Sequence, residues 1–95
     1  MIIPSPAAVT GDGAKHALSS ISGAPTKCKW FKAYLTTGTS ARIGDTNVSS
    51  TRGAPFSATI PFEAPPISLA MEFYDLTQIF YFVGSSDVAD FVFGV

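Results

Sequence analysis

Apolar and polar residues alternate along several short stretches of the chain. In residues 27–37, Phe31, Ala33 and Leu35 occupy one set of alternate positions, and Cys28, Trp30 and Tyr34 occupy the other set. Side chains of a β-strand point alternately to its two faces, so this stretch predicts a central strand with apolar groups on both faces. Alternation also predicts strands in residues 40–44, 56–62, 67–74, 77–83 and 88–95.

Glycine- and proline-rich segments separate these stretches at spacings typical of an all-β domain. They are residues 23–25, 37–39, 44–47, 64–66 and 84–87. Residues 84–87 are predicted to join the last two strands as an antiparallel hairpin. The pattern predicts an antiparallel β-sandwich or jelly roll of six to eight short strands.

The beginning of the chain has a different character. Pro4 and Pro6 favour extended backbone, and Gly11-Asp12-Gly13 is a strong turn signal. Residues 1–13 are therefore predicted to form an extended N-terminal arm, either frayed or lying along a neighbouring subunit. Residues 14–95 are predicted to form the single domain, with an edge strand in residues 14–22.

The composition suggests more apolar surface than one small core can hide. The chain is 46% hydrophobic and 14% charged, against about 25% charged residues in an average soluble domain. Nine of its twelve aromatic residues lie in residues 56–95. A domain of this size buries only about 60–65% of the surface that its unfolded chain exposes. We therefore expect part of the aromatic surface to be covered by a second copy or by another protein.

The charges are unevenly distributed along the chain. All six Lys and Arg residues fall within residues 1–52. Either the two halves interleave in the fold or complementary surfaces meet between subunits. Lys27 and Lys29 lie on the strand face opposite Lys32, a division that disfavours a nucleic-acid stripe. The longest apolar run, residues 79–83, is too short for a membrane span, so no membrane partner is expected.

Few residues offer catalytic or metal-binding chemistry. His16 is the only histidine, and Cys28, the only cysteine, lies in an apolar run that predicts a buried small hydrophobe. Asp75, Asp87 and Asp90 occupy positions where a turn needs a side-chain acceptor. We therefore predict no catalytic residue, no cofactor and no metal. The enzyme alternative requires the three aspartates to converge in one pocket.

Three segments together resemble a known group of proteins. They are Ser-Ala-Arg-Ile-Gly-Asp-Thr-Asn-Val-Ser-Ser-Thr-Arg-Gly at residues 40–53, Tyr-Asp-Leu-Thr-Gln-Ile-Phe-Tyr at residues 74–81 and Phe-Val-Phe-Gly-Val at residues 91–95. With Cys28-Lys29-Trp30-Phe31 before them, they are similar to small structural proteins of tailed bacteriophages and prophages. The resemblance covers about residues 16–95 and excludes the arm.

This resemblance implies a capsid decoration or cement protein that is assembled in the bacterial cytoplasm and resides in the virion. Its partners would be the major capsid protein and further copies of itself, since such proteins commonly form homo-oligomers, often trimers. The expected contact residues are Ile2, Ile3, Trp30, Arg42, Arg52, Phe56, Phe80, Phe82, Phe91 and Phe93. The alternative is a tail, neck or host-recognition module that uses the loops of residues 37–40 and 48–55.

Overall fold

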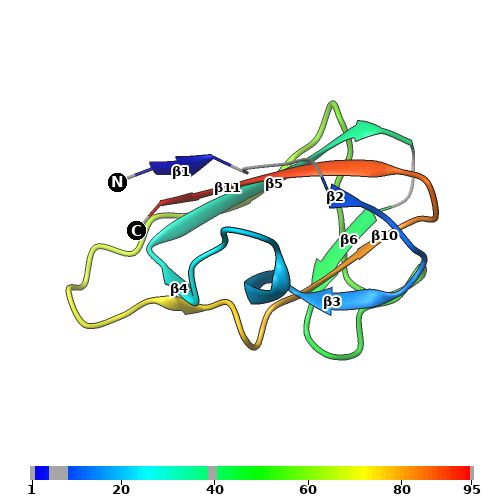
Figure 1. Ribbon diagram of the computed structural model, residues 1–95. Coiled ribbons are helices and arrows are strands. Elements are labelled where there is room, and N and C mark those ends of the chain that lie inside the picture. Colours follow the sequence, from blue (N-terminus) through cyan, green and yellow to red (C-terminus); the bar gives the residue numbers. More distant parts are fainter. Residues whose placement is uncertain (1, 5–8, 39–40, 95) are drawn as a thin grey trace.

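Two antiparallel sheets face each other in the computed structural model, which describes residues 9–38 and 41–94 and the backbone of residues 2–4 (Figure 1). The first sheet has the order β1-β11-β5-β8, and β2 also pairs with β11. Its strands are β1 (Ile2–Pro4), β2 (Val9–Thr10), β5 (Trp30–Thr37), β8 (Phe62–Ala64) and β11 (Val88–Gly94). The all-β sandwich predicted from the alternation is confirmed.

The second sheet has the order β3-β10-β6-β7. Its strands are β3 (Lys15–Ala17), β6 (Ala41–Gly44), β7 (Ala54–Pro55) and β10 (Phe80–Val83). A small pair, β4 (Lys27–Cys28) and β9 (Tyr74–Asp75), and the 3₁₀ turn η1 (Leu18–Ser20) complete the described elements.

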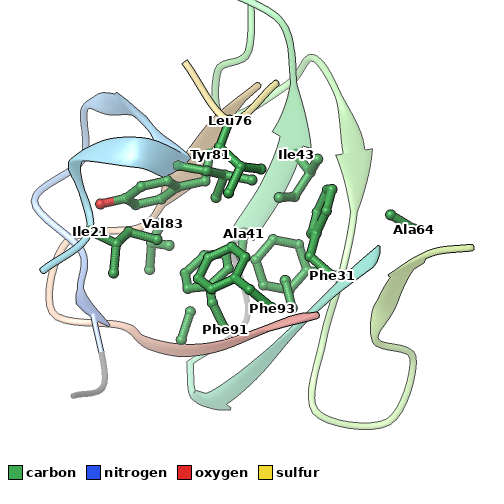
Figure 2. Packing of buried hydrophobic residues seen from close by; sticks show 14 of the residues in the cluster. Ile21, Phe31, Ala41, Ile43, Ala64, Leu76, Tyr81, Val83, Phe91 and Phe93 are labelled. Carbon is green, nitrogen blue, oxygen red and sulfur yellow. The ribbon is translucent and has the colours of Figure 1, made fainter. Parts of the chain in front are cut away.

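The inward positions of the long strands build the core. Phe31, Ala33 and Leu35 of β5 are buried, as their alternation predicts, and β5 lies between β11 and β8 as a central strand. Ring contacts join the sheets: the ring centroids of Tyr81 and Phe91 lie 5.2 Å apart. Figure 2 shows these rings packed together between the ribbons. Burial of these apolar side chains supplies the main driving force for the fold.

The predicted hairpin of the last two strands is wrong. β10 pairs with β3 and β6, whereas β11 pairs with β1, β2 and β5, so residues 84–87 carry the chain from one sheet to the other. Gly11 supports this crossing: its N–H donates to the Asp87 carbonyl oxygen at 2.7 Å, and the Ser86 N–H donates to the Gly11 carbonyl oxygen at 3.1 Å. Tyr81 of β10 and Phe91 of β11 therefore enter the core from opposite sheets.

Residues 2–4 and 9–10 of the N-terminal arm belong to the first sheet. Ile2 pairs with Gly94 and Ile3 with Phe93, and Val9 pairs with Ala89. The extended backbone favoured by Pro4 is thus used along β11 of the same chain.

Three other predicted strands differ from the structure. Only residues 15–17 of the stretch 14–22 form an edge strand, because η1 follows at once. Residues 57–60 form a turn in which the Ser57 N–H donates to the Ile60 carbonyl oxygen at 2.9 Å, and the strand begins only at Phe62. Residues 67–73 form a loop instead of a strand.

Candidate interaction surface

Exposed apolar side chains are concentrated in one loop. Among the described residues, the large hydrophobic side chains classed as exposed are Ile60 (70%), Leu69 (60%), Met71 (91%) and Phe73 (44%). Three of these four lie in residues 65–74, which we name the contact loop. In Figure 1 this loop projects from the end of the sandwich at which β1 and the last residues of β11 also lie. Exposed apolar clusters of this kind often mark protein–protein contact sites.

The contact loop is closed at its neck and turned at its tip. The Tyr74 hydroxyl donates to the Pro65 carbonyl oxygen at 2.7 Å, which joins the two ends of the loop. At the tip, the Glu72 N–H donates to the Leu69 carbonyl oxygen at 3.2 Å. A compact loop with adjacent ends is a common carrier of function.

The Lys29 side chain binds backbone carbonyl oxygens of the contact loop. Its ammonium group donates to the carbonyl oxygens of Leu69, Ala70 and Glu72, which uses all three N–H donors of a lysine. The ammonium nitrogen also lies 4.1 Å from the centroid of the Phe73 ring, a favourable cation–π contact. The Lys29 carbonyl oxygen accepts the Ile67 N–H at 2.9 Å. The loop is therefore ordered before any partner binds, which lowers the entropic cost of binding.

An apolar cavity of about 420 Å³ opens at the base of the contact loop. It lies between β8 of one sheet and β6 of the other. The lining residues are Phe31, Ile43, Gly44, Asp45, Phe62, Ala64, Pro65, Tyr74, Gln78 and Ile79. The exposed residues Asp45, Pro65 and Gln78 form its rim, so the cavity is open to solvent.

The aromatic residues predicted to make contacts are mostly inside the sandwich. Phe56 is 3% exposed and Phe91 and Phe93 are 0% exposed. The prediction of contact side chains at these three positions is therefore corrected, because they face the opposite sheet. Phe80 and Phe82 are half-buried on the outer face of β10.

Trp30 is half-buried on the outer face of β5, opposite Gly94 in the register. A Cβ added at Gly94 would lie 1.9 Å from Trp30 Nε1, so the indole packs directly against the backbone of β11. The side chains of Ile2 and Ile3 lie outside the described residues, as do Thr39 and Ser40 of the loop considered for host recognition.

Several cations bind carbonyl oxygens of the chain itself. Arg42 Nε donates to the Ser50 carbonyl oxygen at 3.1 Å, and Arg42 Nη1 donates to the Gly53 carbonyl oxygen at 2.8 Å. The Lys15 ammonium donates to the Thr46 carbonyl oxygen. Lys32 pairs with Glu63 at 3.3 Å, whereas Arg52 is exposed beside Gly53. Lys15 and Arg42 thus bind the loops of residues 45–53.

The residues considered for catalysis lie on separate elements. Cys28 is buried on β4, and burial raises the pKa of its thiol to about 11, the opposite of what a nucleophile needs. His16 on β3 lies 2.9 Å from an Asp12 carboxylate oxygen.

Two of the aspartates serve different parts of the structure. Asp75 Oδ1 accepts the Thr77 N–H at 3.0 Å and the Thr77 hydroxyl at 2.6 Å, as predicted for a turn acceptor. Asp90 lies within β11, opposite Tyr34, so its predicted role as a turn acceptor is wrong. Within residues 9–38 and 41–94, no group of three His, Cys, Asp or Glu side chains could hold a metal ion.

The contact loop was missed because its sequence alternates like that of a strand. Ile67, Leu69, Met71 and Phe73 fit a period of two, and the loop depends on Lys29, about forty positions earlier. The Pro65-Pro66 pair was the available local signal, since consecutive prolines interrupt strand pairing.

No helix in the described part of the chain is long and apolar enough to cross a membrane. No family model matches the chain, and neither the curated proteins nor the solved structures compared with it include a match.

Proposed function

We propose that this chain is a structural component of a phage particle, a decoration or cement protein that binds the assembled head and stabilises it. The observation that carries the proposal is the contact loop, in which Leu69 and Met71 are exposed on a backbone that Lys29 fixes. An ordered apolar projection suits docking onto another protein, because burying it gains hydrophobic free energy at little ordering cost.

Two further observations support the phage assignment. The resemblance in residues 40–53 and 74–81 points to small virion proteins, and a β-sandwich is a suitable scaffold for such a role. The residues of this resemblance have structural uses: Asp45 Oδ1 accepts the Asn47 N–H at 2.8 Å, and Arg42 binds the loop that follows. These residues of the segment 40–53 therefore stabilise the local fold of the chain.

Particles made with and without the protein test the proposal. We expect particles that lack it to release their DNA at a lower temperature, and added purified protein to restore the original release temperature. Protein carrying Met71→Asp should restore the release temperature less well than protein carrying Ile60→Asp. The second variant is the control, because it removes an exposed apolar side chain from a separate turn. Unchanged DNA release in the absence of the protein would contradict a cementing role.

Immunogold electron microscopy of whole particles locates the protein. Label on heads supports the proposal. Label restricted to tails or necks would favour the alternative of a tail, neck or host-recognition module.

A further inference from the structure

We infer that a cavity beside Arg42 binds a carboxylate group that is carried on a short aliphatic chain. The cavity has a volume of about 220 Å³ and lies between β6, β7 and the turn of residues 57–60. Its lining residues are Ala41, Arg42, Ser50, Pro55, Phe56, Ser57 and Ile60. None of them belongs to the contact loop, so the inference goes beyond the proposed function and does not rest on it.

The positive charge of Arg42 has no negative partner within residues 9–38 and 41–94. Its hydrogen bonds go to the carbonyl oxygens of Ser50 and Gly53, which carry no net charge. The ion pairs that the described residues form are those of His16 with Asp12 and of Lys32 with Glu63. Arg42 is also half-buried. A charge that is partly removed from water is stabilised by an opposite charge nearby, so the cavity favours an anion.

The guanidinium group of Arg42 has donors left for such an anion. An arginine side chain carries five N–H donors in one plane. Two of them bind the loop carbonyl oxygens, one from Nε and one from Nη1, so three remain. Such a planar fork matches the two oxygens of a carboxylate. The Ser50 hydroxyl also lines the cavity and makes no hydrogen bond to a described residue, so it can donate to a bound oxygen.

The other walls of the cavity favour a ligand with an aliphatic part. Pro55, Phe56 and Ile60 are apolar. The turn that carries Ile60 is closed by two hydrogen bonds: the Ser57 N–H donates to the Ile60 carbonyl oxygen at 2.9 Å, and the Ile60 N–H donates to Ser57 Oγ at 3.1 Å. A cavity of about 150 Å³ accepts a benzene molecule, so this space has room for a four-carbon acid. Inorganic phosphate has no apolar part to bury against these walls.

A nuclear magnetic resonance titration with sodium butyrate at constant ionic strength tests the inference. We expect saturable shifts of the backbone amide signals of the lining residues and of the Arg42 Nε–H signal. Inorganic phosphate and the uncharged analogue 1-butanol should each bind about tenfold more weakly or less, since each lacks one half of the ligand. Shifts that do not saturate, or equal binding of butyrate and either analogue, would overturn the inference.

Two arginine variants show which charge holds the carboxylate. Arg42→Met should weaken butyrate binding about tenfold or more, because it removes the charged donors. Arg52→Met is the matched control, since it removes the same charge from an exposed position that does not line the cavity, and it should leave binding unchanged. Equal effects of the two variants would overturn the inference.

Arg42→Met also removes the hydrogen bonds to Ser50 and Gly53, so a second pair of variants keeps Arg42 in place. Ile60→Asp puts a carboxylate of the chain itself at the cavity wall, where it should occupy the guanidinium group. Ile60→Asn has a similar shape without the charge. Both should stay folded by circular dichroism, because Ile60 is 70% exposed. We expect Ile60→Asp to bind butyrate about tenfold more weakly than Ile60→Asn. Equal binding would overturn the inference.

The same carboxylate chemistry can come from a free acid or from a glutamate side chain of another protein. The amide of N-acetylglutamate, titrated in the same way, separates the two sources. Tighter binding of butyrate assigns the site to a free acid, and tighter binding of the glutamate derivative assigns it to an acidic side chain. Failure of both compounds to bind would overturn the inference and leave the proposed function untouched.

Discussion

Asp75 illustrates how single side chains fix the irregular parts of this fold. Its carboxylate accepts two hydrogen bonds from Thr77, one from the hydroxyl and one from the backbone N–H. The Thr77 hydroxyl and then the Thr77 N–H lower the pKa of Asp75 below its usual value. Asp12 has a lowered pKa for similar reasons, chiefly its hydrogen bond with His16. The turn acceptor at Asp75 was predicted correctly although the strand expected before it is a loop, whereas the hydrogen bond between Asp12 and His16 needed the structure.

Acid should weaken the fold partly through Asp75. Its pKa is lower in the folded than in the unfolded chain, so its stabilisation is present above the ordinary Asp pKa of about 3.9 and is lost as the pH falls through the lowered value. We expect Asp75→Asn, which keeps the acceptor oxygen but does not titrate, to lose less stability between pH 7 and pH 2 than wild type. Urea unfolding at both pH values measures this. An identical loss in the two proteins would contradict the role of Asp75.

The thiol of Cys28 should be unreactive in the folded protein. Burial raises its pKa to about 11, so little thiolate exists at pH 8, and the side chain is 0% exposed. We expect a disulfide reagent such as 5,5′-dithiobis(2-nitrobenzoate) to label it slowly in buffer and rapidly in denaturant. Rapid labelling of the native protein would show that β4 opens readily.

At the scale of elements, alternation was a sound guide only where a strand has its apolar side chains facing the other sheet. Residues 30–37 and 88–94 were predicted well, because both strands lie inside the first sheet and their alternate side chains are buried. The same alternation wrongly predicted a strand in residues 67–73, which form a loop. There the carbonyl oxygens of Leu69, Ala70 and Glu72 bind an ammonium group from a remote part of the chain. A contact between residues so far apart leaves no periodic signal in the sequence.

Removing the ammonium group of Lys29 should loosen the contact loop. Lys29→Met keeps the aliphatic stem but removes three donors, and hydrogen bonds to charged groups each contribute about 1.5–3 kcal/mol. Because the site is partly solvated, we expect a total loss of about 1–3 kcal/mol in the free energy of unfolding. Hydrogen exchange of residues 69–72 should accelerate strongly.

Lys27→Met is the matched control, because it removes the same charge from an exposed position on neighbouring β4. It should leave exchange in the loop unchanged. Equal protection of the loop in both variants would show that Lys29 does not order it.

At the scale of the molecule, the sandwich shields most of the rings that the sequence placed in its second half. Less apolar surface is exposed than the composition suggested: among the described residues, Leu69, Met71 and Ile60 are strongly exposed and Phe73 less so. The composition indicated a surplus but not its location, since two facing sheets bury inward rings from both sides. The crossing of residues 84–87 between sheets is the feature that sequence pattern missed at this scale.

Core and outer-face rings should differ in their contribution to stability. Phe91→Ala removes a ring that is 0% exposed and contacts Tyr81 and Phe93, so we expect a loss of about 3–5 kcal/mol. Phe82→Ala on the outer face of β10 should cost about 1–2 kcal/mol, since its side chain is only half-buried. Urea unfolding of the two variants gives the comparison. A larger loss for Phe82→Ala would mean that the outer face of β10 is covered.

The shared location of β1, the end of β11 and the contact loop has a practical consequence for anyone handling this protein. A bulky affinity tag or fluorescent fusion joined next to β1 or β11 would share this end of the sandwich with the contact loop. A label placed on the turn of residues 57–60, or removed by protease before use, would keep that end of the sandwich accessible.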